Sequence, residues 1–408
     1  MNKSRYKKTM NNIYKLKGRI MNYSWGGHEF LPHLLGFEPE GHQTYAEYWM
    51  GAHKNAPSKL ICENETGEDL DKLIETNPQT VLGEAVAYKY HALPYLLKIL
   101  DVKSMLSIQV HPDKQQAEAG FARENQKGVP ADSPHRNYKD DNHKPELMVA
   151  LGDFWLLHGF LEEDKLRNRL KNIPEFGRFL PIFNHEGYKG LYQTVMELPI
   201  EAVDKILTPL LNRILPLYKN GELSKSSPDY WAAKAAANDH TPHVDRGIFS
   251  IYFFNLLQLN KNEGIFQAAG IPHAYLEGQN IELMANSDNV LRGGLTPKHV
   301  DVQELLNLVQ FHGVTPQIIK PSHRYGETIY ATPADDFELS KIELKENDTY
   351  LHQAFSLEII LIIQGEVAIG SQNFKRGEAA AIFAKEDYHI TSLSGDSILF
   401  KATIPDKK

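Results

Sequence analysis

The chain has 408 residues, of which 42% are hydrophobic and 24% are charged. This composition is ordinary for a globular protein, and the length suffices for two or three domains with proper cores. A formal net charge of -8 provides no basic footprint for nucleic acid or for an acidic membrane, although a local basic pocket for an anionic small molecule is compatible with it.

The N-terminal segment MNKSRYKKTMNN is basic but lacks the apolar stretch of a signal peptide. We expect residues 1–17 to form an N-terminal arm; either it is disordered or Met10 is an alternative start. Cys62 is the single cysteine, so no intramolecular disulfide is possible, which fits the cytoplasm. The apolar run FSIYFFNLLQL is too short to span a membrane, and we expect no membrane partner.

Short strands with turn residues between them are predicted for residues 18–150. A polar segment rich in turn formers, residues 122–142, predicts a long loop of the kind that often serves as a lid or binding loop. Helical patterns follow Phe160. In EAVDKILTPLLNRILPLY, Pro209 should kink the helix or begin a second one. The apolar residues with the spacing of one buried helix face are Val203, Ile206, Leu207, Leu210, Leu211 and Ile214. We interpret residues 155–245 as an inserted helical subdomain that packs and has no chemistry.

Strand character returns at GIFSIYFFNLLQL and again at IFQAAGIPHAY. LTPKHVDVQELLNLVQF predicts a helix that starts at Thr296 or Pro297. From about residue 325 onward, short strands separated by glycines are typical of an antiparallel sandwich or barrel. This segment contains His352 and His389 but no paired ligand motif, so we expect it to bind no metal. The sequence contains no nucleotide-binding glycine motif after a strand.

Candidate metal ligands occur in three separate segments. Gln109 and His111 are two residues apart in a predicted strand, so both point to one face. Glu146 opens the apolar run of NHKPELMVAL, and His273 follows another apolar run in AAGIPHAY. Two imidazoles, one carboxylate and one neutral oxygen form a plausible ligand set for a divalent ion such as zinc.

Five blocks in order resemble type I phosphomannose isomerases, a family of zinc enzymes in the cupin superfamily. The blocks are RIMNYSWGGHEF, YAEYWMGAHKNAPSKL, LPYLLKILDVKSMLSIQVHPDK, YKDDNHKPELMVAL and IPHAYLEGQNIELMANSDNVLRGGLTPKHVDV. Together they span about residues 18 to 302, and chance does not explain five blocks in the family's order. Gly293 and the pair His299–Val300 depart from the usual pattern, but neither change touches a proposed functional position.

The resemblance implies a mainly β fold of cupin-type jelly-roll barrels, with a catalytic barrel, a degenerate C-terminal barrel and an inserted α-helical subdomain. The catalytic domain would comprise residues 18–154 and 246–324, and the C-terminal domain residues 325–408. The family's ligands for one zinc ion per chain carry over to the same four residues: Gln109, His111, Glu146 and His273.

The implied reaction interconverts mannose 6-phosphate and fructose 6-phosphate through an enediol or enediolate whose negative oxygen a cation can stabilise. Arg292 is the expected catalytic residue, because its planar fork can orient substrate, and Lys144 is the second candidate. Resemblance assigns the phosphate to Lys98, Ser107 and Lys298, and the remaining cavity to His143, Glu282 and Asp288. Tyr275 and Trp25 are candidates for the sugar wall, although a core role suits Trp25 as well. We expect a monomer.

Two other functions are compatible with parts of the pattern. A non-catalytic, zinc-containing sugar-binding cupin would keep the ligands, but intact Arg292 and Lys144 beside them weigh against it. An iron-dependent cupin oxygenase usually has a His-rich site, whereas this ligand set has two histidines.

Overall fold

The computed structural model describes residues 12–61, 67–239 and 241–406, so the predictions about Met10 and Cys62 lie outside the described residues. Contacts group the chain into two units. The first takes in the N-terminal residues through Tyr23, His28–Ile99 and the residues from Lys320 onward, and the second takes in Ser24–Gly27 and Leu100–Ile319. The predicted mainly β fold with a helical insertion is confirmed. The contact units do not follow the predicted domain boundaries, which stay a prediction.

The second unit holds two sheets that share one long strand. Its strands are β6 (Gln109–Val110), β7 (Glu146–Ala150), β8 (Phe154–Phe160), β9 (Phe254–Leu259), β10 (Gly264–Gln267), β11 (His273–Ala285), β12 (Leu291–Arg292) and β13 (Ile318–Ile319). The orders are β13-β10-β7-β11 and β12-β6-β11-β8-β9. The start of β11 pairs with β6 and β8, whereas Asn280–Met284 pair with β7. One strand therefore carries residues into both sheets.

A glycine permits β11 to change sheets. The register between β8 and β11 shifts between Tyr275 and Glu277, which marks a bulge that bends the strand. Gly278 follows with φ +128, and a Cβ there would lie 2.6 Å from a ring carbon of Phe154 and 2.7 Å from the carbonyl oxygen of Asp153. Only glycine fits this close approach of two backbones without displacement.

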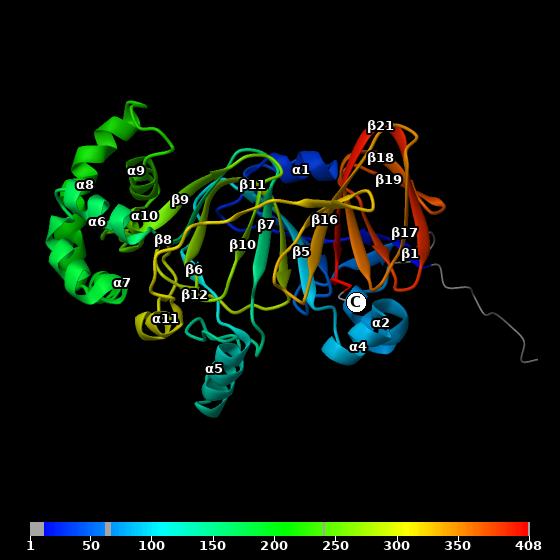
Figure 1. Ribbon diagram of the computed structural model, residues 1–408, viewed down its shortest axis with the longest axis horizontal. Coiled ribbons are helices and arrows are strands. Elements are labelled where there is room, and N and C mark those ends of the chain that lie inside the picture. The colour runs from blue at the N-terminus through cyan, green and yellow to red at the C-terminus, as the bar shows by residue number, and fades with distance from the viewer. Residues whose placement is uncertain (1–11, 62–66, 240, 407–408) are drawn as a thin grey trace, which may run out of the picture. The chain divides into compact units, whose positions relative to one another are not determined.

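Helices of the second unit gather beside β8 and β9 (Figure 1). They are α6 (Glu163–Asn172), η1 (Gly177–Phe179), α7 (Leu180–Glu197), α8 (Ile200–Lys219), α9 (Pro228–Asn238) and α10 (Gly247–Phe253). The predicted buried face of α8 is confirmed in full, because all six of its apolar residues are buried. Pro209 lies inside this one helix, so the alternative of a second helix starting there is wrong. The strand predicted across GIFSIYFFNLLQL is also wrong in its first half, since Gly247–Phe253 is helical and the strand starts at Phe254.

Two helices flank the loops of the second unit. Helix α5 (Lys114–Gln126) starts at a capping box, in which the Asp113 side chain accepts from the Gln116 backbone and the Gln116 side chain accepts from the Asp113 backbone. The predicted loop of residues 122–142 is therefore helical up to Gln126. Helix α11 (Val302–Leu308) begins after Asp301, whose side chain accepts from the Glu304 backbone. Its start is later than the predicted Thr296 or Pro297, because the Asp301 carboxylate provides the N-cap.

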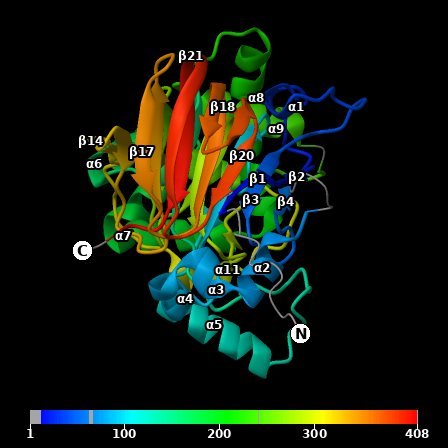
Figure 2. The ribbon, with the colours of Figure 1, turned by 90° about the vertical axis from the view of Figure 1, so that its right-hand side faces the viewer.

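The first unit contains a large antiparallel sheet, whose central strands lie side by side in Figure 2. The order is β14-β15-β16-β21-β18-β20-β1-β4, with β17 paired to β21 and β19 paired to β18. The strands are β1 (Ile13–Lys17), β4 (Lys59–Ile61), β14 (Ser322–Arg324), β15 (Glu327–Tyr330), β16 (Glu338–Leu344), β17 (Thr349–Gln353), β18 (Glu358–Ile369), β19 (Gln372–Lys375), β20 (Ala379–Ile382) and β21 (Asp387–Thr403). Residues 13–17, predicted as part of an arm, thus form a strand that pairs with β20.

Further strands and the helices of the first unit come from its N-terminal part. They are β2 (Arg19–Met21), β3 (Glu47–Gly51), β5 (Tyr95–Val102), α1 (Phe30–Leu35), α2 (Leu70–Thr76), α3 (Pro78–Leu82) and α4 (Glu84–Tyr90). The last three residues of β5 fall in the second unit. Within the described ranges, no helix has the length and apolar character needed to cross a membrane.

Candidate metal centre and active site

Strand register places four polar side chains in one row across the second unit. Arg292 on β12 lies opposite Gln109 on β6, and Gln109 lies opposite His273 on β11. His273 in turn lies opposite His158 on β8. Residues directly opposite each other in antiparallel strands share a face, with Cβ atoms about 5 Å apart. The predicted catalytic arginine and two of the predicted ligands therefore sit on one face by register alone.

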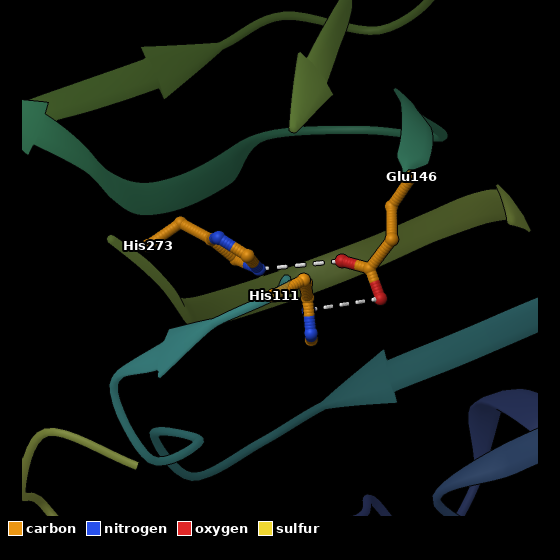
Figure 3. A group of neighbouring side chains, drawn as sticks. All are labelled: His111, Glu146 and His273. Atoms are coloured by element: carbon orange, nitrogen blue, oxygen red, sulfur yellow. Dashed lines mark ion pairs between the residues drawn. The ribbon is translucent and has the colours of Figure 1, made fainter. Parts of the chain in front are cut away.

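Glu146 reaches this row from β7 in the other sheet (Figure 3). Its Oε1 lies 3.4 Å from Nε2 of His111, and its Oε2 lies 3.2 Å from Nε2 of His273. The two imidazole rings have centroids 5.1 Å apart. All three side chains are buried, and their nearest ligand atoms lie within 4.8 Å of one another. His111 directly follows the two-residue strand β6, so the predicted strand ends one residue before it.

The hydrogen bonds of both rings leave one nitrogen for a metal. Nδ1 of His111 lies 2.8 Å from the carbonyl oxygen of Asn289, and Nδ1 of His273 lies 3.1 Å from that of Ile271. A carbonyl can only accept, so each Nδ1 carries a proton, and a neutral ring presents the lone pair of its Nε2 toward Glu146. Nε2 of His111 is fully buried and makes no hydrogen bond. Two lone pairs facing a buried carboxylate fit a cation, and the donor set suits zinc.

Burial and charge tune the three ligands. Burial lowers the pKa of His111 to about 4, which keeps its ring neutral and able to bind a metal. Burial alone would raise the pKa of Glu146, but the surrounding positive charge, including that of the Lys144 ammonium, outweighs it and holds the pKa well below its ordinary value. Nζ of Lys144 lies 3.4 Å from Oε1 of Glu146, and the lysine is buried. Lys144 precedes β7, so a loop rather than the predicted strand brings it to the carboxylate.

The two other predicted cations of the second unit form a local positive pair. Arg292 is partly buried, and burial lowers its pKa. Lys298 lies on the exposed loop that follows, and its pKa is lowered by burial and by the charge of Arg292. Arg292 lies close enough to lower the pKa of Lys298, and such a concentration of positive charge is suited to an anionic ligand.

The remaining predicted residues of the second unit lie near the centre or in its walls. The Tyr275 ring is buried and packs against the rings of Phe154 and His273 at centroid distances of 5.3 and 6.3 Å. Glu282 is buried on the half of β11 that pairs with β7. Trp25 is half-buried against an apolar cluster, which supports its core role. The half-buried residues in loops or at strand edges are Ser107, His143 and Asp288.

Lys98 belongs to the first unit, unlike the other predicted residues. It is buried on β5, with Nζ 3.6 Å from Oε2 of Glu47 and 4.9 Å from the centroid of the Trp49 ring.

Three buried residues around the centre were not predicted from the sequence. Nδ1 of His158 lies 2.7 Å from Oε1 of Gln267, and Nε2 of Gln267 is buried without a hydrogen bond. Gln267 lies opposite Glu146 in the register of β10 and β7. The third residue, Asn289, provides the carbonyl that orients His111. Of the three, only Asn289 lies in one of the five sequence blocks, and no role was predicted for it.

Comparisons with known proteins agree on one family. Residues 13–162 match the sequence model of the phosphomannose isomerase type I catalytic domain. The chain is 36% identical over 386 residues to a mannose-6-phosphate isomerase of Escherichia coli, covering 92% of this chain and 95% of that protein. An Arabidopsis thaliana relative, mannose-6-phosphate isomerase 2, is 31% identical over 437 residues, covering 97% and 94% of the two chains.

Solved structures give the same result. A variant of phosphomannose isomerase from Salmonella typhimurium superposes with a TM-score of 0.87 at 34% identity, covering 96% of this chain and 99% of that one. The Salmonella enzyme bound to its substrate and to zinc has a TM-score of 0.85 at the same identity and coverage.

Fold and site together define a cupin-type isomerase with a divalent-metal centre built from His, Glu and His. The chain belongs to the type I phosphomannose isomerase family. The family membership predicted from the five sequence blocks is thereby confirmed.

Proposed function

We propose that this protein interconverts mannose 6-phosphate and fructose 6-phosphate with one zinc ion per chain. The observation that carries the proposal is the strand register that places Arg292, Gln109 and His273 on one face. The Glu146 carboxylate lies close to both His273 and His111 beside this face. The relatives that match over almost their whole length are named for this reaction. A Salmonella relative has been solved with its substrate and zinc bound.

His111, Glu146 and His273 would hold the zinc, and Gln109 would complete the set from its place opposite His273. When bound, the zinc acts as a Lewis acid that polarises an oxygen of the substrate. The protein's contribution is two imidazoles whose Nδ1 atoms are held by backbone carbonyls, and a carboxylate that stays ionised. Hydrogen bonds behind the ligands orient the rings and support metal binding.

The reaction moves one proton between two carbon atoms. A base removes the proton from C2 of the aldose, giving an enediol or enediolate, and a proton is returned to C1. The hydroxyl proton passes from O2 to O1, so the carbonyl moves from C1 to C2. In our assignment, the Arg292 guanidinium stabilises the negative oxygen and orients the diol through its two parallel N–H groups. Lys144, beside Glu146, would serve as a second cation or as the proton-transfer group.

Substrate recognition is assigned to the residues that the family resemblance implies. Lys98, Ser107 and Lys298 would bind the phosphate, and the positive charge of Arg292 near Lys298 favours an anion there. Tyr275 and Trp25 would line the sugar, and His143, Glu282 and Asp288 would open the ring or move protons. Solved variants of the Salmonella enzyme replace two histidines, a glutamate, an arginine and a lysine. These are the residue types of the ligands and cations assigned here.

We assign the protein to the cytoplasm as a monomer, with a catalytic domain at residues 18–154 and 246–324, a helical subdomain at 155–245 and a C-terminal domain at 325–408. The single cysteine, which is typical of proteins in a reducing compartment, supports the location. Analytical ultracentrifugation at assay concentration tests the monomer directly.

An anaerobic coupled assay on a panel of hexose and pentose phosphates tests the proposed reaction. We expect turnover of mannose 6-phosphate to fructose 6-phosphate with little turnover of pentose phosphates. Binding of mannose 6-phosphate without turnover would favour the sugar-binding protein instead. Activity that appears only with oxygen, together with oxygen uptake, would favour the oxygenase.

A further inference from the structure

Two loop segments of the second unit are joined through one buried asparagine. Asn289 is fully buried. Its Nδ2 donates to the carbonyl oxygens of Asp140 and Asn142, both at 2.8 Å. Its Oδ1 accepts from the backbone N–H groups of Lys139 at 2.7 Å and Asp140 at 3.2 Å. These bonds join residues at least 147 positions apart, so they are tertiary contacts and no local turn accounts for them.

Asp140 returns hydrogen bonds to the segment that carries Asn289. Its Oδ1 accepts from Oγ of Ser287 at 2.7 Å, and its Oδ2 accepts from the backbone N–H of Asp288 at 2.7 Å. Oγ of Ser287 also accepts from the backbone N–H of Asn289 at 3.2 Å. We call Asp140, Ser287 and Asn289 the polar hub. Each of the three residues forms hydrogen bonds between the segment around Asp140 and the segment around Asn289.

Two of the chain segments that leave the hub lead to proposed site residues. Asn142 is followed by Lys144 and Glu146, and Asn289 is followed by Arg292. The third connection is direct, because the carbonyl oxygen of Asn289 accepts from Nδ1 of His111 at 2.8 Å. A metal ligand next to β6, a ligand on β7 and the cations beside them thus share one anchor. Buried hydrogen-bond networks of this kind are rigid when every member is satisfied.

We propose that Asn289 is the positioning residue of the metal centre. It holds the Lys144–Glu146 segment at a fixed place relative to His111, and its carbonyl fixes the tautomer that leaves Nε2 of His111 for the metal. Partners of this kind behind the ligands set the metal affinity, and their loss typically lowers it by about 10- to 100-fold. The inference rests on the proposed zinc-dependent function, but its test measures zinc binding and does not require the enzyme to turn over substrate.

The test measures zinc affinity by competition with a chromophoric chelator, in wild type, Asn289→Ala and Asn289→Asp. The aspartate keeps the acceptor half of the side chain but turns a carboxylate toward the carbonyls of Asp140 and Asn142. Asn255→Ala is the matched control, because Asn255 is a buried asparagine of the same unit whose Nδ2 bonds backbone carbonyls, among them those of Phe160 and Val314. The visible spectrum of the cobalt-substituted proteins reports the ligand geometry.

We expect both Asn289 variants to bind zinc about 10- to 100-fold more weakly and to change the cobalt spectrum, while Asn255→Ala changes stability alone. Equal zinc affinity in Asn289→Ala and Asn255→Ala at equal loss of stability would overturn the inference. If the Asn289 variants do not fold, Ser287→Ala replaces them, with a smaller shift in the same direction expected and an unchanged affinity counting against the hub. A wild type that binds zinc without isomerising sugar phosphates would contradict the proposed function and leave this inference intact.

Discussion

Arg292 lies one strand from Gln109 and two from His273 in the same row, without being a metal ligand. If it stabilises charge that develops only in the transition state, its loss must affect kcat more than KM. We expect Arg292→Ala to lower kcat by about 10²- to 10³-fold with normal zinc content. Steady-state kinetics with metal analysis checks this, and Arg292→Lys serves as the control that keeps the charge but not the fork. A wild-type kcat in Arg292→Ala would make Lys144 the leading cation.

Lys298 provides the contrast, since it is exposed on the loop after Arg292 and is assigned to the phosphate. Lys298→Ala should raise KM for mannose 6-phosphate with little change in kcat, because a phosphate contact is made equally in the ground and transition states. The same variant should leave the binding of phosphate-free mannose unchanged. A drop in kcat at constant KM would place Lys298 in the chemistry instead.

Buried histidines make the metal-free protein sensitive to acid. Burial lowers the pKa of both His111 and His158 to about 4. In an unfolded chain, the pKa of a histidine is about 6.5. The unfolded state therefore binds more protons below a pH of about 6.5, and stability falls as the pH drops from 7 toward 4. Between pH 7 and pH 5 the loss is about 2 kcal/mol for each histidine.

Urea unfolding of chelator-treated protein at several pH values measures this slope. His158→Gln should remove about half of it, since one of the two histidines is gone while a donor to Gln267 remains. An unfolding free energy that is flat between pH 7 and pH 5 would contradict the buried neutral state of both rings.

At the residue scale, ligand chemistry and motif spacing in the sequence were enough to predict the metal ligands. His111, Glu146 and His273 stand in recognisable segments, and the structure brings them together. His158 and Gln267 gave no signal, because their place depends on which strands pair and in which register. Asn289 acts through its backbone carbonyl and through contacts with a segment far away in the sequence, and no local pattern encodes such a contact.

At the scale of elements, the C-terminal sheet carries an ammonium ion of its own beside His352. Nζ of Lys401 lies 2.6 Å from Oε1 of Glu327 and 3.3 Å from Nε2 of His352. Oε1 of Glu358, a third buried charge, lies 3.8 Å from Nζ of Lys401. A fixed cation among these carboxylates gives a physical reason for the prediction that the C-terminal domain binds no metal, and metal analysis of His273→Ala tests that prediction.

Removal of this ammonium should be costly. Lys401→Met leaves two buried carboxylates without their cation, and we expect a loss of about 3–5 kcal/mol in unfolding free energy. Lys385→Met is the matched control, because the pair of Lys385 and Glu84 is exposed and such pairs contribute less than about 1 kcal/mol. Urea unfolding of both variants measures the two losses in unfolding free energy. Equal losses would show that Lys401 is not the charge that stabilises this sheet.

Element prediction succeeded where one physical signal dominated. The apolar spacing of α8 gave its buried face in full, since a helix that packs on one side keeps its period. It failed at Gly247–Phe253, where every residue is buried. A fully apolar run lacks the alternation that separates a buried strand from a buried helix, so the sequence could not distinguish the two.

At the scale of the whole molecule, the site depends on segments that the sequence keeps far apart. Ligands come from β6, β7 and β11, and β11 takes part in both sheets of the second unit because Gly278 permits the crossing. The mainly β class and the helical insertion followed from strand and helix patterns. The crossing did not, because a single glycine in a strand pattern predicts a bulge but not which sheets it connects.

The central claim is that one zinc ion in the centre of His111, Glu146 and His273 enables the isomerisation. Titration of chelator-treated protein with zinc, followed by the coupled mannose 6-phosphate assay, tests it most directly. We predict that activity is absent without metal and rises linearly to a plateau at about one equivalent of zinc per chain, and that His273→Ala neither binds zinc tightly nor recovers activity. Full activity in the metal-free protein, or in His273→Ala, would contradict the claim.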